Sequence, residues 1–146
     1  MKYQKVYVQE KIEADASNVW QLIRDFSEIS AWGPGEVVKT EGLGVGMIRH
    51  IDFNSEMLVE RCEAHDNAQM SFSYRLLESP WPISDYVAIV VLTTEGPNKT
   101  LIEWSSVYQS TSESIEATEA TRNFIENTYR KGFIARLRKN ATKLHA

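Results

Sequence analysis

The sequence predicts an α+β fold in which a curved antiparallel sheet of about seven strands surrounds one long C-terminal helix. Residues 111–146 contain no proline and one glycine, Gly132, among many good helix formers. At 1.5 Å per residue this helix would be about 45–50 Å long, longer than a small domain is wide. Most of the remaining chain shows strand patterns on short connections, which favours an antiparallel sheet. A curved sheet around such a helix leaves interior space, where we look for the functional site.

The charge pattern of the C-terminal segment supports one continuous helix. Ser112 is expected to cap its start. Acidic residues dominate its first half and basic residues its second half, which complements the helix dipole. The expected apolar face consists of Thr121, Phe124, Ile125, Thr128 and Ala135, with Tyr129, Phe133, Leu137 and Leu144 continuing it around the side.

The N-terminal part of the chain is expected to form one strand and two short helices. Residues 2–14 alternate between apolar and polar side chains, which is typical of a half-buried strand. Asp15 or Ser17 is expected to cap a short helix whose apolar side chains recur at helical spacing through Phe26. A second short turn of helix is expected over residues 27–32, before a proline between two glycines stops it.

The middle of the chain predicts the remaining strands. They are expected at residues 36–40, 46–53, 56–64, 70–77, 85–94 and 100–109. Asn54 and Ser55 form a plausible two-residue hairpin loop between the strands at 46–53 and 56–64. Strands segregated from helices are typical of the α+β class, and the length suits a single domain over residues 1–146.

Composition limits the classes of function. A net charge of −4 argues against a nucleic-acid partner, because phosphate binding needs a basic surface. The lone cysteine, Cys62, cannot form an internal disulfide. No apolar run is long enough for stable membrane insertion, and no signal-peptide core is evident. We therefore expect a cytoplasmic protein, present as a monomer or weak dimer.

The register of the hairpin around Asn54 and Ser55 predicts a buried ion pair. A two-residue loop pairs Phe53 with Glu56, Ile51 with Leu58, Arg49 with Glu60, and Met47 with Cys62. Because side chains alternate with period two, all of these pairs share one face. Most are apolar, so this face should be the concave one, with Arg49 opposite Glu60. The pair is either an anchor or acid–base device for a ligand, or a structural ion pair that fixes the register.

Aromatic side chains are expected to line the interior space. The candidates are Phe72, Tyr74, Tyr86, Trp104, Tyr108 and Phe124. Such rings usually form packed core, which is the alternative interpretation. Tyrosine hydroxyls, with Ser106 and Thr128, instead favour an apolar pocket that contains a few polar groups. Trp32 and Trp81 lie on loops near the expected mouth, where each is either a lid or a cover for a helix edge.

Other motifs give no cofactor or metal site. His50, His65 and His145 lack metal-ligand spacing. The glycines at 42, 44 and 46 precede a strand rather than a helix, so they predict a turn and not a nucleotide-binding loop. We expect Cys62 to be a buried structural thiol and the protein to use no cofactor.

Several stretches resemble one superfamily over nearly the whole chain. They are Asn18-Val-Trp-Gln-Leu-Ile-Arg-Asp-Phe26 with Trp32, Gly44-Val-Gly-Met-Ile-Arg49, Val59-Glu-Arg61, Ser73-Tyr-Arg-Leu-Leu-Glu-Ser-Pro80, Ser84-Asp-Tyr86, Ile102-Glu-Trp-Ser105 and Phe124-Ile-Glu-Asn-Thr-Tyr129. The chain resembles the START-like (SRPBCC) superfamily and its polyketide cyclase/dehydrase-like branch. The resemblance implies the helix-grip fold. It also implies that Glu60 and Tyr86 match positions that line the pocket in plant hormone receptors of this superfamily.

The resemblance leaves three hypotheses for function. The first is a carrier or sensor that holds a hydrophobic small molecule such as a lipid, polyketide or aromatic metabolite, with Arg49, Glu60 and Tyr86 orienting its polar end. The second is a cyclase or dehydratase in which Glu60 or Tyr86 moves a proton and Arg49 stabilises an enolate oxygen. The third is a protein-interaction module with a vestigial cavity. In the receptors a hairpin and the following loop close as gate and latch, whereas the hairpin at residues 53–56 leaves little loop to swing.

Overall fold

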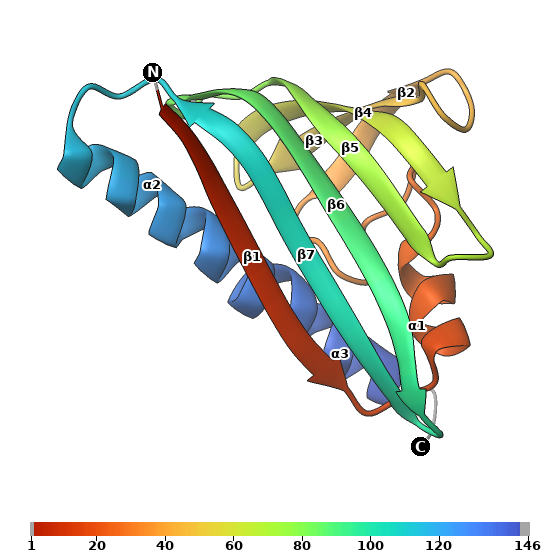
Figure 1. The fold of residues 1–146 in the computed structure, drawn as a ribbon. Coiled ribbons are helices and arrows are strands. Elements are labelled where there is room, and N and C mark those ends of the chain that lie inside the picture. The colour runs from red at the N-terminus through yellow and green to blue at the C-terminus, as the bar shows by residue number, and fades with distance from the viewer. Residues whose placement is uncertain (1, 144–146) are drawn as a thin grey trace.

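A seven-stranded antiparallel sheet curves around a long C-terminal helical rod (Figure 1). The computed structural model describes residues 2–143. The strands are β1 (Lys2–Ile12), β2 (Glu36–Glu41), β3 (Ile48–Phe53), β4 (Glu56–Asp66), β5 (Ser71–Glu78), β6 (Ile83–Gly96) and β7 (Lys99–Ser110). They are ordered β1-β7-β6-β5-β4-β3-β2, which confirms the predicted α+β helix-grip fold. No helix within residues 2–143 is long and apolar enough to span a membrane.

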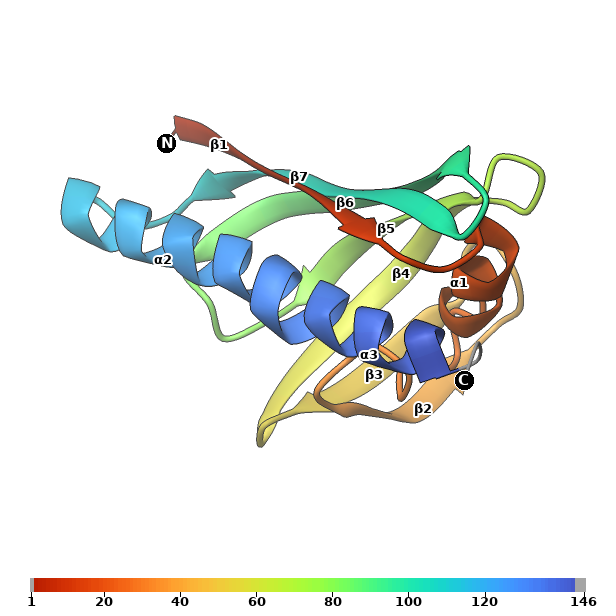
Figure 2. The same ribbon diagram turned by 90° about the horizontal axis from the view of Figure 1, so that it is seen from below.

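The C-terminal rod is one helix in outline but three segments in detail. These are α2 (Ile115–Asn127), a π-helical segment η1 (Thr128–Ile134) and α3 (Ala135–Lys143). Viewed from below, the rod crosses the open side of the sheet (Figure 2). The cap is Ser114, whose hydroxyl accepts the Ala117 N–H at 3.2 Å, so the predicted cap at Ser112 was wrong. Ser112 instead accepts the Ser114 N–H within the preceding turn.

The π-helical segment changes which face of the rod is buried. Tyr129 and Ile134 lie five positions apart and are both buried, and this spacing fits the i→i+5 hydrogen bonds of a π turn. The buried face of the rod therefore differs from the apolar face predicted for an uninterrupted α-helix. Ala135 is exposed, and Phe124 is 43% exposed. Leu144 and His145 lie outside the described residues.

Only one of the two predicted N-terminal helices forms. It is α1 (Ala16–Ile23), which begins after Asp15. Residues 24–35 form turns instead, because the Trp32 and Gly33 N–H groups both bond to the Ile29 carbonyl and the glycine–proline sequence prevents continuation. Gly35 then lies against β3, where a Cβ would be 2.2 Å from the Asp52 carbonyl oxygen. The segment therefore ends directly beside β3, where β2 begins to pair with it.

The β3–β4 hairpin has the predicted register. Phe53 pairs with Glu56, and Arg49 pairs with Glu60. Asn54 and Ser55 have φ values of 51° and 73°, as a two-residue type I′ loop requires. At the other end, Cys62 accepts a hydrogen bond from Gly46 and donates one to Met47, so two residues oppose one as in a β-bulge.

The two halves of the sheet differ in regularity. β1 pairs with β7 over its whole length, and buried side chains such as Val6, Ile102 and Trp104 form a continuous core there. β5 and β6 pair only from Ser71–Arg75, and Asp85, with φ of 54°, lies in an irregular stretch of β6. β5 and β6 therefore stop pairing beyond Arg75, in the half of the sheet that borders the interior space. We call this half the open half of the sheet.

Candidate functional site

A small cavity lies between the open half of the sheet and the helical rod. Its volume is about 30 Å³, room for about two water molecules. It is lined by Ile29, Trp32, Gly33, Pro34, Ile51, Phe53, Leu58, Glu60, Tyr74, Leu76, Trp81, Tyr86, Phe124, Ile125, Thr128, Tyr129 and Phe133. Glu60 is the one charged residue among them, so the interior is a narrow aromatic and aliphatic space with a single carboxylate in its wall.

Nine of the fourteen candidate ligand-binding residues line this cavity. They are Trp32, Ile51, Phe53, Glu60, Tyr74, Trp81, Tyr86, Phe124 and Thr128. They come from β3, β4, β5, β6, α2, η1 and the two loops that contain the tryptophans. Period-two alternation in the strands accounts for the inward direction of Ile51, Phe53 and Tyr74.

The other five candidates lie behind the cavity wall. Arg49, Phe72, Trp104, Ser106 and Tyr108 have the predicted inward orientation and are buried, but other side chains cover them. Phe72 packs against Trp20 of α1, and Trp104 lies under Trp32 and Phe133. Tyr108 packs beside Tyr86. In these positions they support the wall rather than form its surface.

Arg49 and Glu60 form the predicted ion pair on adjacent strands. The Arg49 Nε donates to Glu60 Oε1 at 2.9 Å. Nη2 lies 2.7 Å from the same oxygen, but outside hydrogen-bond geometry, so that contact is a Coulombic one. Arg49 is 1% exposed and Glu60 is 7% exposed. Burial of either charge alone would be costly, and the pairing offsets much of that cost.

The guanidinium of Arg49 is buried behind the cavity wall. Its Nη1 donates to the Phe26 carbonyl oxygen at 3.0 Å, and the Phe26 ring lies 3.8 Å from the guanidinium carbon. The rings of Trp32 and Tyr74 lie 5.5 and 5.4 Å from the same carbon. Arg49 therefore does not reach the cavity, and Glu60 alone presents the pair to it.

A cluster of tyrosine hydroxyls lies next to the carboxylate. The hydroxyls of Tyr86 and Tyr129 are hydrogen-bonded to each other, and Trp104 Nε1 donates to the Tyr74 hydroxyl at 3.1 Å. Burial raises the pKa of the Tyr74, Tyr86 and Tyr129 phenols, and nearby charge on Glu60 adds to the effect. These phenols are accordingly neutral near pH 7 and able to donate hydrogen bonds.

The outer end of the cavity is closed by aromatic rings. Trp81, on the loop between β5 and β6, packs edge-on against Phe53 at 5.9 Å and against Phe124 at 5.4 Å. On the solvent side, Trp81 and Phe124 border a shallow hollow beside α2. Trp32 is only 3% exposed and lies deeper, against Trp104 and Phe133. Of the two loop tryptophans, Trp81 thus occupies the mouth and Trp32 the interior.

Eight lining residues were not among the predicted candidates. They are Ile29, Gly33, Pro34, Leu58, Leu76, Ile125, Tyr129 and Phe133. Leu58 and Leu76 follow the same alternation as their neighbours, and Ile125, Tyr129 and Phe133 belong to the predicted apolar side of the helix, so these five carried a signal. No sequence pattern placed Ile29, Gly33 or Pro34 at the cavity, because a turn without regular structure brings them there.

Histidine and cysteine side chains have structural contacts. His50 contacts Glu41 on the outer face, and His65 Nε2 lies 2.7 Å from the Arg24 carbonyl oxygen. Burial raises the pKa of the Cys62 thiol. Across residues 2–143 no group of three histidine, cysteine, aspartate or glutamate side chains is placed to hold a metal ion.

Comparison with known proteins places this architecture in a family. A family model described as polyketide cyclase / dehydrase and lipid transport matches residues 3–145. The chain belongs to this family. Among curated proteins, none matches the chain.

Solved structures share the family fold at low sequence identity. Protein XoxI from Bacillus cereus is 22% identical with a TM-score of 0.81, covering 100% of this chain and 99% of its own. The ZhuI aromatase/cyclase from Streptomyces sp. R1128 is 17% identical with a TM-score of 0.75, covering 99% and 97%. A norcoclaurine synthase mutant from Thalictrum flavum, solved with a transition-state analogue, is 15% identical with a TM-score of 0.75, covering 99% and 98%. At these identities the likeness establishes the fold alone.

Proposed function

We propose that this protein binds a hydrophobic small molecule, such as a lipid, polyketide or aromatic metabolite, in the cavity between sheet and rod, as a carrier or sensor. The observation that carries the proposal is the composition of the wall: apolar and aromatic side chains surround a single carboxylate, Glu60. Small-molecule sites combine an apolar lining with a few polar groups in this way. The family description, which includes lipid transport, supports the same class of function.

The cavity must widen to admit such a ligand. Pockets for drug-sized molecules measure about 300–1,000 Å³, far more than the present volume. The mouth is the part of the wall best suited to move, because Phe124 is 43% exposed and Ile125 is the one buried residue of α2. The π-helical segment beside it interrupts the regular helix and offers a hinge. We therefore propose that α2 and Trp81 separate when a ligand enters.

Native mass spectrometry of the purified protein tests the proposal. We expect a co-purified or added apolar compound bound at one per chain. The matched control is Leu58→Trp, which adds bulk at a buried lining position and should lower occupancy while the circular dichroism spectrum stays unchanged. Absence of any bound compound, together with no uptake of added lipids or aromatic compounds, would argue for the protein-interaction module with a vestigial cavity.

A second candidate function is a cyclase or dehydratase activity in the same cavity. It is favoured by the position of Glu60 next to neutral phenols: a carboxylate can take a proton from a carbon beside a carbonyl, while Tyr86 or Tyr129 donates a hydrogen bond to the developing oxygen. Because Arg49 is buried behind the cavity wall, we propose that a phenol and not Arg49 stabilises the enolate oxygen.

Glu60→Gln separates the two candidates. In an enzyme the substitution would abolish conversion of a poly-β-ketone probe and change its affinity only a few-fold, whereas a carrier would return the probe unchanged before and after substitution. Tyr86→Phe is the companion variant, since it removes the phenol and keeps the ring. Product formation by the wild type is decisive for the enzyme.

A further inference from the structure

Two residues at the inner end of the cavity each have a polar atom suited to contact a ligand. Both contacts from Arg49 go to Glu60 Oε1, so Oε2 is the oxygen left for the cavity that Glu60 lines. Trp32 also lines the cavity, and its buried Nε1–H has no acceptor within residues 2–143. A buried donor without an acceptor is costly, and such groups point to a missing water or ligand atom.

The acceptor and the donor are gathered around the same guanidinium. Glu60 contacts Arg49 at 2.7 Å, and the Trp32 ring lies 5.5 Å from the guanidinium carbon. Arg49 does not line the cavity. Its Nη2 makes no hydrogen bond but lies 2.7 Å from Glu60 Oε1, its Nη1 donates to the Phe26 carbonyl, and the Phe26 ring covers it. The polar end of the cavity consequently combines one anionic acceptor with one neutral donor.

We propose that the ligand of this cavity carries a hydroxyl group, as an alcohol or a phenol, and that free carboxylates are excluded. The inference rests on the proposed binding function and specifies its ligand class. The hydroxyl donates its hydrogen to Glu60 Oε2 and accepts the Trp32 Nε1–H, so both groups are satisfied by one oxygen.

Other polar groups satisfy this end of the cavity less well. A ketone or an ester accepts from Trp32 but gives Glu60 no hydrogen. An ammonium group donates to Glu60 but cannot accept from Trp32. A carboxylate places a second negative charge beside Glu60 in a water-poor space, where the enclosed Arg49 cannot reach it. The arrangement therefore selects against the head group of free fatty acids and other organic acids.

Three probes with the same ring system test the inference: naphthalene, 2-naphthol and 2-naphthoate. Their common size makes the cost of opening the mouth nearly equal, so affinity ratios report on the polar end. In nuclear magnetic resonance titrations at neutral pH we expect 2-naphthol to bind wild-type protein at least about tenfold more tightly than either other probe, as a hydrogen bond to a charged group implies. The Trp32 indole N–H resonance should shift with 2-naphthol and stay in place with naphthalene.

The outcomes separate this inference from the proposed function. If naphthalene or 2-naphthoate binds as tightly as 2-naphthol, the hydroxyl assignment is overturned while small-molecule binding stands. If none of the three binds, and longer-chain alcohols and hydrocarbons also fail, the binding function itself falls.

Two tryptophan variants assign the donor. Trp32→Phe removes Nε1–H and keeps a ring, so the advantage of 2-naphthol over naphthalene should fall at least about threefold. The matched control is Trp81→Phe at the mouth, which should change all three affinities by the same factor. A folded Trp32→Phe protein with an unchanged ratio of the two affinities would remove Trp32 from the site.

Glu60→Gln tests the acceptor. If this variant folds, its affinity for 2-naphthoate should come to within about threefold of its affinity for 2-naphthol.

Discussion

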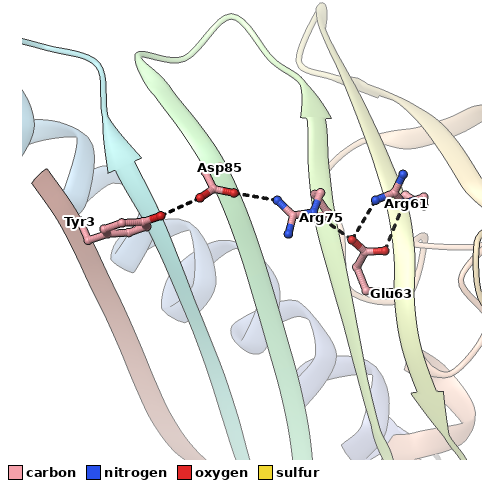
Figure 3. A network of polar contacts seen from close by, with 5 residues as sticks. All are labelled: Tyr3, Arg61, Glu63, Arg75 and Asp85. Atoms are coloured by element: carbon pink, nitrogen blue, oxygen red, sulfur yellow. Dashed lines mark hydrogen bonds and ion pairs between the residues drawn. The ribbon is translucent and has the colours of Figure 1, made fainter. Parts of the chain in front are cut away.

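The sheet carries a buried ion pair on its inner face and a solvent-exposed network of ion pairs on its outer face. On the outer face, Asp85 accepts hydrogen bonds from Tyr3 and from Arg75, each at 2.8 Å. Arg75 also bonds to Glu63, which is held from the other side by Arg61 (Figure 3). On this face four charges and a phenol are linked across β1, β6, β5 and β4.

The inner and outer ion pairs consist of the same kinds of side chain but differ strongly in their exposure to water. The outer side chains of Arg75 and Asp85 are 34% and 47% exposed, whereas the inner side chains of Arg49 and Glu60 are 1% and 9% exposed. Water solvates the outer network whether or not its pairs form, so each pair contributes little. The inner pair has lost its water and depends on its partners. The comparison teaches that a polar group in this sheet is informative about function only where it is buried.

Among substitutions in these ion pairs, Arg49→Ala should lower the free energy of unfolding the most. It leaves the Glu60 carboxylate buried without its cation, and we expect the free energy of unfolding to fall by about 3–5 kcal/mol. Urea unfolding followed by circular dichroism measures it. The control replaces both partners, Arg49→Met with Glu60→Leu, and should be within about 1–2 kcal/mol of wild type or more stable. Equal losses in the single and double variants would mean that packing and not charge holds this position.

Alkaline unfolding should separate the inner tyrosines from those outside. Burial raises the folded-state pKa of Tyr74, Tyr86 and Tyr129 above the ordinary value of 10.0. Their neutral form therefore supports folding fully below pH 10.0, and this support is lost as the pH rises toward the folded-state pKa. Each phenol should contribute about 1.4 kcal/mol per pH unit to the loss.

Ultraviolet absorbance of tyrosinate measures this difference. The inner phenols should ionise only together with the unfolding transition. Tyr86→Phe should make the loss of stability less steep by one phenol. Ionisation of Tyr74, Tyr86 and Tyr129 ahead of unfolding would contradict their burial.

Arg75→Ala, on the outer face, should lower the free energy of unfolding the least. Because Arg75 belongs to the solvated outer network, its removal should change the free energy of unfolding by less than about 1 kcal/mol, and added salt should reduce the difference further. The bonds from Tyr3 and Arg75 lower the pKa of the Asp85 carboxyl. The contribution of the ionised Asp85 carboxylate to stability should therefore be present above the ordinary pKa of aspartate and be lost as the pH falls. Urea unfolding at two salt concentrations measures the effect, and a loss as large as that of Arg49→Ala would erase the distinction between the faces.

Local rules made much of the fold and the ion pair predictable. A two-residue loop at Asn54 and Ser55 fixes the β3–β4 register, and period two then places Arg49 and Glu60 together on the inner face. Alternation along β5 and β7 likewise gave the inward direction of Tyr74 and Trp104. These are properties of neighbouring residues, so the sequence contains them directly.

The remaining parts depend on contacts between distant segments. Phe26, on an irregular turn, covers Arg49 and removes it from the cavity, and no local pattern indicates this. The π-helical segment rotates the rod so that Ile134 is buried and Ala135 is exposed, where an ideal helix predicts a different face. The cavity volume depends on how rings from the rod and from the sheet interlock, and composition does not determine it.

Intermolecular nuclear Overhauser effects from bound 2-naphthol test the central claim most directly, because they locate a ligand relative to the two faces of the sheet. The account predicts contacts to Thr128, Phe133 and the Trp32 indole N–H, all at the inner cavity. Contacts to Ile89 and Val107, which are exposed side chains, without any to these three residues, would contradict it.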